Sequence, residues 1–156
     1  MHIISFYDII ASVGESSRQM DYQSLADFRY EIRRFLNFSE AAARAAGIEP
    51  QQHQALLAIK GRGAGVETTV GALAERLQVR HHTAVELSRR LEARGWIRRS
   101  RSRNDARKVD LRLTRRGEAL LKKLSIVHRD ELRMAGPRLI VALRSVIAHS
   151  GKRRTR

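Results

Sequence analysis

The stretch TVGALAERLQVRHHTAVELSRRLEARGWI, residues 69–97, contains two helical patterns separated by a very short turn. Thr69 is a residue type that caps the start of a helix, and apolar residues follow it at the spacing of one helical face. A three-residue turn around Val79 leads into a second helix, which we expect to run over residues 81–94 and to end at Gly95. The stretch therefore predicts a helix-turn-helix.

A pair of strand patterns follows this motif directly. Residues 96–99 and 108–113 are rich in strand formers, and the second run alternates polar and apolar residues. Residues 100–107, between the two runs, are polar and basic, as is typical of a hairpin tip. We therefore expect a basic β-hairpin beside the second helix.

Further helical patterns flank the motif and the hairpin. We expect a helix over residues 21–46, a helix over residues 50–60 that begins with a proline, and a short strand at 66–68. After the hairpin, Thr114 opens a long helix, which Gly136-Pro137 should break before a final helix. The chain is thus predicted to be mainly α with one small β-hairpin wing.

Positive charge is concentrated in two parts of the chain. The formal net charge is +15, and residues 76–116 hold fourteen Lys/Arg against four Asp/Glu. Residues 144–156 contribute five bases and no acid, so the rest of the chain is balanced. A local excess of this kind indicates a polyanion-binding face.

The composition also excludes several classes of protein. The chain has no cysteine, which removes disulfides, thiolate zinc sites and cysteine redox sensing. It shows no phosphate-binding loop, nucleophile elbow or His-Glu-x-x-His motif, so we expect neither an enzyme nor a cofactor. No apolar run reaches the length of a membrane span. We expect a cytoplasmic, nucleoid-associated protein.

A helix-turn-helix followed by a basic hairpin is suited to duplex DNA. A helix fits the major groove and can present its first turn to base edges, while an arginine at the hairpin tip can enter a narrow minor groove. Basic residues on both elements neutralise phosphates and release counterions. The pattern therefore favours double-stranded DNA as the partner.

The same residues resemble the MarR family of regulators. Residues 69–79 and 83–97 resemble the two halves of its helix-turn-helix, and Asp105-Ala106-Arg107, followed by Thr114 and Gly117, is similar to its wing signature. The resemblance extends over about residues 21–148. It implies a winged helix-turn-helix with N- and C-terminal dimerisation helices. It also implies a repressor that acts as a homodimer on a near-palindromic operator and responds to a small molecule bound between the dimerisation and DNA-binding regions.

The resemblance also implies roles for individual residues. The start of the second helix would face bases or phosphates, Arg107 would enter the minor groove, and Asp105 would hold the wing tip. The full set of expected DNA-binding residues is Arg80, His81, His82, Thr83, Glu86, Arg89, Arg90, Arg101, Arg103, Asp105 and Arg107.

Two positions depart from the family pattern. Arg80 stands where a small capping residue is common, and Glu86 stands where a neutral or basic contact is common. A carboxylate at Glu86 is repelled by phosphate but could accept a hydrogen bond from cytosine. Alternative interpretations are a metal half-site at His81-His82, which lacks a partner motif, and a nonspecific nucleoid-type DNA-binding protein.

These patterns predict the following organisation. Residues 1–20 form an N-terminal arm, 21–48 and 115–148 form the dimerisation helices, 49–114 form the DNA-binding domain, and 149–156 form a basic tail.

Overall fold

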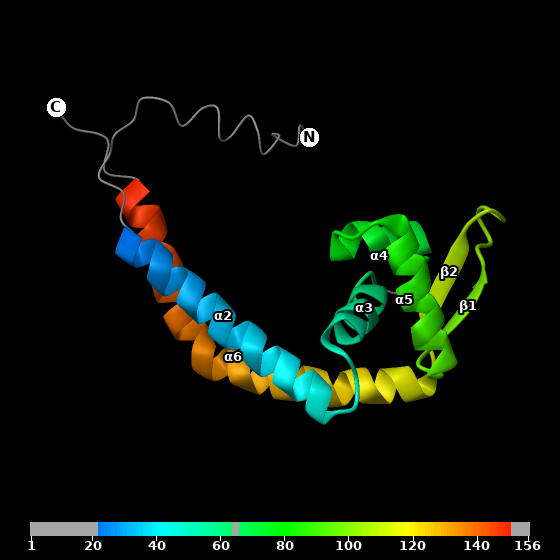
Figure 1. Cartoon of the computed structure of the whole chain (residues 1–156), viewed down its shortest axis with the longest axis horizontal. Coiled ribbons are helices and arrows are strands. Elements are labelled where there is room, and N and C mark those ends of the chain that lie inside the picture. Colours follow the sequence, from blue (N-terminus) through cyan, green and yellow to red (C-terminus); the bar gives the residue numbers. More distant parts are fainter. Residues whose placement is uncertain (1–21, 64–65, 151–156) are drawn as a thin grey trace.

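A computed structural model of the chain describes residues 22–63 and 66–150. Five helices and one hairpin follow one another in these residues (Figure 1). Their bounds are α2 (Tyr22–Ala45), α3 (Pro50–Lys60), α4 (Val70–Leu77), α5 (His81–Ala93), β1 (Ile97–Arg101), β2 (Val109–Leu113) and α6 (Arg115–Ser150). The mainly helical fold with one β-hairpin is confirmed. The predicted arm at 1–20 and the tail beyond residue 150 lie outside the described residues.

Local signals set the boundaries of the first three helices. Gly47 has a φ of 77°, and this left-handed residue ends α2 with its amide bonded to the Arg44 carbonyl at 3.0 Å. Pro50 opens α3 behind a capping box formed by Glu49 and Gln52. The Thr69 hydroxyl accepts from the Ala72 amide at 3.2 Å and caps α4, as its sequence position predicts.

One hydrophobic core joins α3, α4, α5 and the hairpin into a winged-helix module. Leu56, Leu73, Leu91 and Leu111 come from four different elements, and each is at most 1% exposed. Trp96 is also buried in this core, beneath the Arg94 guanidinium at 5.1 Å from its ring centroid. Burying side chains of this size stabilises the fold by about 1.5–3 kcal/mol each. The core therefore fixes α5 and the hairpin relative to each other.

Helices α2 and α6 form an arm that projects from this module. In Figure 1, α2 lies alongside the C-terminal half of α6 in the opposite direction. The N-terminal part of α6 instead runs under the module, where Leu121 and Leu124 join its core. Helix α6 thus belongs to both parts of the molecule.

The predicted break at Gly136-Pro137 is wrong. Helix α6 continues through Pro137 to Ser150, and Figure 1 shows it as one ribbon that bends along its length. A proline inside a helix costs about 3 kcal/mol, since it removes one backbone bond and its ring meets the preceding turn. Packing along α2 offsets this cost: Ala135 and Ala142 are buried beside it, and Arg138 approaches Glu31 at 3.8 Å.

One smaller prediction about the strands is also wrong. Residues 66–68 form no strand; only an isolated bridge joins Thr69 to Asp110. The predicted second strand is confirmed as β2, although its burial does not follow the polar–apolar alternation of its sequence, since Asp110 and Leu111 are both buried. Asp110 is buried because its carboxylate accepts from the Thr68 amide at 3.0 Å and from Arg112 Nε at 2.8 Å. Its charge is satisfied inside the module.

Candidate nucleic-acid interface

The first candidate surface is the outward face of α5. This helix buries Ala84, Leu87, Ser88 and Leu91 against the core. The opposite face leaves the expected contact residues in solvent: Arg80, His81, His82, Glu86, Arg89 and Arg90 are exposed, and Thr83 is half-buried. The expected DNA-binding residues of α5 therefore lie together on its outward face.

The departures from the family pattern are visible in this helix. Helix α5 begins at His81 although Arg80, at the cap position, makes no capping side-chain bond. Glu86 accepts from Arg90 Nε at 3.0 Å, one helical turn away. Both side chains are exposed, so this pair contributes little to stability and can open at little cost.

The wing tip is held by a turn around Asp105. Its Oδ1 accepts from the Arg107 amide at 3.0 Å and from Arg107 Nε at 3.3 Å. These two bonds are the main reasons why the pKa of Asp105 lies below its usual range. The Arg107 side chain is nevertheless 92% exposed. The structure therefore presents this guanidinium to solvent while its backbone is held in place.

The other wing residues flank this tip. Arg101 ends β1 and Arg103 follows it, and both are exposed. Strand β1 pairs with β2 in antiparallel register, with Arg99 opposite Leu111 and Arg101 opposite Val109. The basic side chains thus stand on a short, regular hairpin.

Sequence reasoning missed three residues near this surface. Glu67 and Ser102 bond to each other across the base of the wing tip, 35 positions apart in the chain. Arg99 lines a small cleft of about 230 Å³ between α5 and the wing, together with His81, Lys108 and Arg107. No local pattern signals these roles, since each depends on a contact between distant segments.

A tight junction fixes the hairpin to α6. The Thr114 hydroxyl donates to the Gly95 carbonyl at 2.7 Å and accepts from the Gly117 amide at 3.1 Å. A Cβ atom at Gly117 would lie 2.0 Å from the Trp96 carbonyl oxygen. Glycine is therefore required at position 117 for this close approach, which explains the Thr114-x-x-Gly117 spacing.

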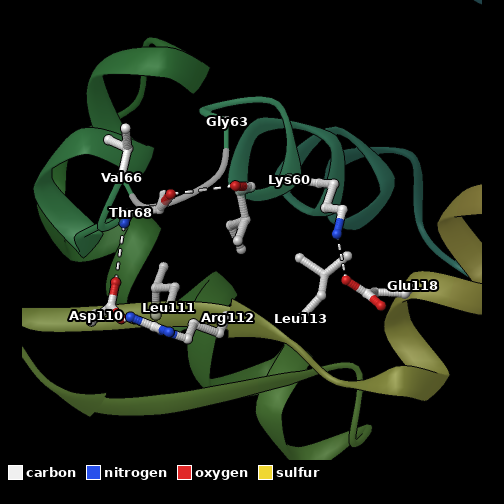
Figure 2. A pocket seen from close by; sticks show the side chains of 10 residues that line it. Lys60, Gly63, Val66, Thr68, Asp110, Leu111, Arg112, Leu113 and Glu118 are labelled. Carbon is white, nitrogen blue, oxygen red and sulfur yellow. Dashed lines mark hydrogen bonds and ion pairs between the residues drawn. The ribbon is translucent and has the colours of Figure 1, made fainter.

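Larger cavities lie away from this surface, and two of them adjoin the winged-helix module. One, of about 550 Å³, is bounded by the end of α3, by β2 and by the start of α6 (Figure 2). Its apolar floor includes Leu111 and Leu113, and its charged groups are already paired, Lys60 with Glu118 and Arg112 with Asp110.

The second cavity, of about 490 Å³, lies between α2, α3 and α6. Two histidine rings stand in it with their centroids 4.7 Å apart, His53 from α3 and His128 from α6. His128 bonds through Nε2 to the Ser39 hydroxyl at 2.8 Å, whereas the buried Nδ1 of His53 has no hydrogen-bond partner within the described part of the chain. Burial, and then the neighbouring His128, lower the pKa of His53. Phe35 and Leu57 add apolar surface.

The structure gives no support to a metal half-site at His81-His82. Within residues 22–63 and 66–150, no three or more His, Asp or Glu side chains gather as a metal ion would need. Among the same residues, no helix has the length and apolar character to cross a membrane.

A model of the MarR family matches residues 46–108, which span α3, both helices of the motif and the wing tip. This winged helix is similar to the MarR family. The match is shorter than the expected resemblance over residues 21–148 and leaves out α2, β2 and α6 entirely. No curated protein sequence matches the chain.

Solved structures resemble the chain over more of its length. A mutant of MepR from Staphylococcus aureus, bound to an oligodeoxyribonucleotide, is 21% identical with a TM-score of 0.60, over 74% of this chain and 82% of that one. MarR from Escherichia coli in its apo form is 20% identical with a TM-score of 0.61, over the same shares. AbsC, a MarR family transcriptional regulator from Streptomyces coelicolor, is 15% identical with a TM-score of 0.61, over 86% and 82%. These likenesses confirm the fold over more of the chain than the winged helix alone.

Proposed function

We propose that this protein is a transcription regulator that binds specific sites on double-stranded DNA as a homodimer. The proposal rests on one observation: α5 and the wing pack on the same hydrophobic core, which holds these two basic elements side by side. Helix α5 exposes its first turn, and the wing beside it exposes 92% of the Arg107 side chain. A helix in the major groove and an arginine in the adjacent minor groove require this arrangement.

The proposed contacts divide by the kind of information that each can read. Residues His81, His82, Thr83 and Glu86 would lie nearest base edges, because they occupy the first turns of α5. Arg107 would read minor-groove width. The remaining bases would contact phosphates and supply salt-dependent affinity: Arg80, Arg89, Arg90, Arg101 and Arg103.

The proposed dimer would cover apolar side chains on the arm. The described part of α2 and α6 leaves large apolar residues in solvent: Tyr22, Tyr30, Leu36, Ile126, Val127, Leu132, Met134, Ile140, Val141, Leu143 and Ile147. A stripe of this extent is unusual on a monomer and is typical of an interface. We assign residues 21–48 and 115–148 to dimerisation and residues 49–114 to DNA binding. A dimer would place two copies of α5 on half-sites about one DNA turn apart.

We propose that the protein acts as a repressor. The cavity between α2, α3 and α6 is its proposed effector site. The cavity joins the arm to the winged-helix module and combines Phe35 and Leu57 with polar groups of His53 and His128. A small molecule with an apolar body and a few polar groups suits such a lining. The MepR structure bound to an oligodeoxyribonucleotide supports DNA as the partner of this fold.

Selection of bound fragments from random duplex DNA, followed by footprinting, tests this proposal. We expect enrichment of a near-palindromic sequence and protection confined to it. Uniform protection of every sequence would favour a nonspecific nucleoid-type protein instead. Sedimentation at micromolar concentration tests the dimer, and a stable folded monomer would contradict it.

A further inference from the structure

A carboxylate outside both DNA-facing elements bonds to the wing tip. Glu67 lies in the segment between α3 and α4. Its Oε2 accepts from the Ser102 hydroxyl at 2.5 Å, and its Oε1 accepts from the Arg103 amide at 3.0 Å. Both oxygens of Glu67 therefore hold consecutive residues of the wing.

The Ser102 hydroxyl, which donates to Glu67, also bonds to the backbone of the turn at the wing tip. Its oxygen accepts from the Asn104 amide at 3.1 Å and from the Asp105 amide at 3.2 Å, and the residue is only 7% exposed. Asp105 in turn bonds the amide and the Nε of Arg107. A continuous series of hydrogen bonds thus connects Glu67 to the exposed guanidinium.

The negative charge of Glu67 allows its electrostatic effect on DNA binding to be distinguished from its structural effect on the wing. The hydrogen bonds, first that from Ser102 and then that from the Arg103 amide, lower the pKa of Glu67, so it is ionised at neutral pH. A carboxylate close to a DNA-binding surface repels phosphates, and its charge alone would weaken binding. Removal of the carboxylate should therefore strengthen DNA binding if its charge decides the outcome, and weaken DNA binding if its hydrogen bonds to the wing decide it.

We propose that Glu67 is a positioning residue, which sets the sequence specificity of the wing by holding the tip that presents Arg107 without touching DNA itself. The proposal rests on the proposed DNA-binding function. Neutralising Glu67 should weaken binding to the selected site, although it removes a negative charge. A held wing loses less conformational freedom on binding than a free one, which favours the specific complex.

The test compares Glu67→Ala and Ser102→Ala with a matched control, Glu75→Gln. Glu75 is an exposed carboxylate on α4 and bonds to no wing residue within the described chain. We expect Glu75→Gln to bind the selected site as tightly as the parent or slightly more tightly. Glu67→Ala and Ser102→Ala should each weaken binding about tenfold and flatten the base preference at the positions next to the wing.

A double variant separates positioning from general loss of stability. If Glu67 acts through Arg107, then Glu67→Ala combined with Arg107→Ala should bind no more weakly than Arg107→Ala alone. Additive losses, or tighter binding by Glu67→Ala, would overturn the proposal.

Amide hydrogen exchange without DNA distinguishes failure of this proposal from failure of the proposed function. Exchange at Arg103, Asn104 and Asp105 should be faster in Glu67→Ala, while exchange in α5 stays unchanged. Unchanged exchange at the wing would overturn the positioning role even if the protein binds DNA. A parent protein that selects no DNA sequence would refute the proposed function, whereas the exchange result would still report whether Glu67 holds the wing.

Discussion

Replacement of Gly117 by alanine tests whether the hairpin–α6 junction depends on a close backbone approach. Gly117 lies in the first turn of α6, where alanine normally stabilises a helix by about 1 kcal/mol relative to glycine. At this position, however, the new Cβ would lie 2.0 Å from the Trp96 carbonyl oxygen and 2.9 Å from its carbonyl carbon. Neither atom can rotate away, since both are backbone.

The expected cost follows from that geometry. Relieving the overlap requires moving the start of α6, which costs typically about 1–3 kcal/mol in a packed region. The movement would also strain the bond from the Thr114 amide to the Trp96 carbonyl, 3.0 Å in length and worth about 1 kcal/mol. After the gain in helix propensity, we expect Gly117→Ala to lower the free energy of unfolding by roughly 1–3 kcal/mol.

Urea unfolding followed by circular dichroism measures this difference, at equal protein concentrations because a dimer's stability depends on concentration. Gly136→Ala is the matched control in the same helix, since among the described residues an added Cβ there would meet nothing within 4 Å apart from its chain neighbours and the adjacent backbone of the helix. We expect the control to equal or exceed the parent in stability. A Gly117→Ala protein as stable as the parent would refute the close-approach argument.

Three further outcomes can be checked. Arg107→Ala should weaken DNA binding and alter the preference at A·T-rich minor-groove positions, as measured by repeating the selection; an unchanged profile would remove this residue from the interface. Asp110→Asn should lower the free energy of unfolding by roughly 1–3 kcal/mol in urea, because Arg112 loses its buried ionic partner. The parent should lose stability as the pH falls below 6.5, because unfolded histidine takes up a proton there while His53 in the folded protein resists it. His53→Gln should show a shallower loss over the same range, and an identical pH profile would refute this assignment.

The sequence was sufficient where local signals decide the structure. Pro50 and Thr69 predict the starts of α3 and α4, and both helices begin there in the structure. Gly95 predicts the end of α5, and its φ of 70° shows why glycine is used. The hairpin between the helix-turn-helix and α6 was also predicted from local signals, namely two runs of strand formers on either side of a polar, basic segment.

The sequence was insufficient where contacts between distant segments decide the outcome. Pro137 predicts a break, but packing against α2 keeps α6 continuous. Asp110 reads as the polar position of an alternating strand, but the Thr68 amide and Arg112 satisfy it in the interior. Glu67 carries no local signal at all, since its partners on the wing lie about 35 residues further along the chain.

The continuity of α6 has a geometric consequence for any control of DNA binding. The helix has 36 residues and is therefore about 54 Å long, and it is anchored to α2 near Arg138 and to the hairpin at Gly117. These two anchors are about 30 Å apart along the helix. A tilt of about 5° at the Arg138 anchor would displace the hairpin by about 3 Å, close to the rise of one base pair. In the proposed DNA complex, a small change in the angle of α6 at the arm would therefore become a shift of the hairpin along the DNA.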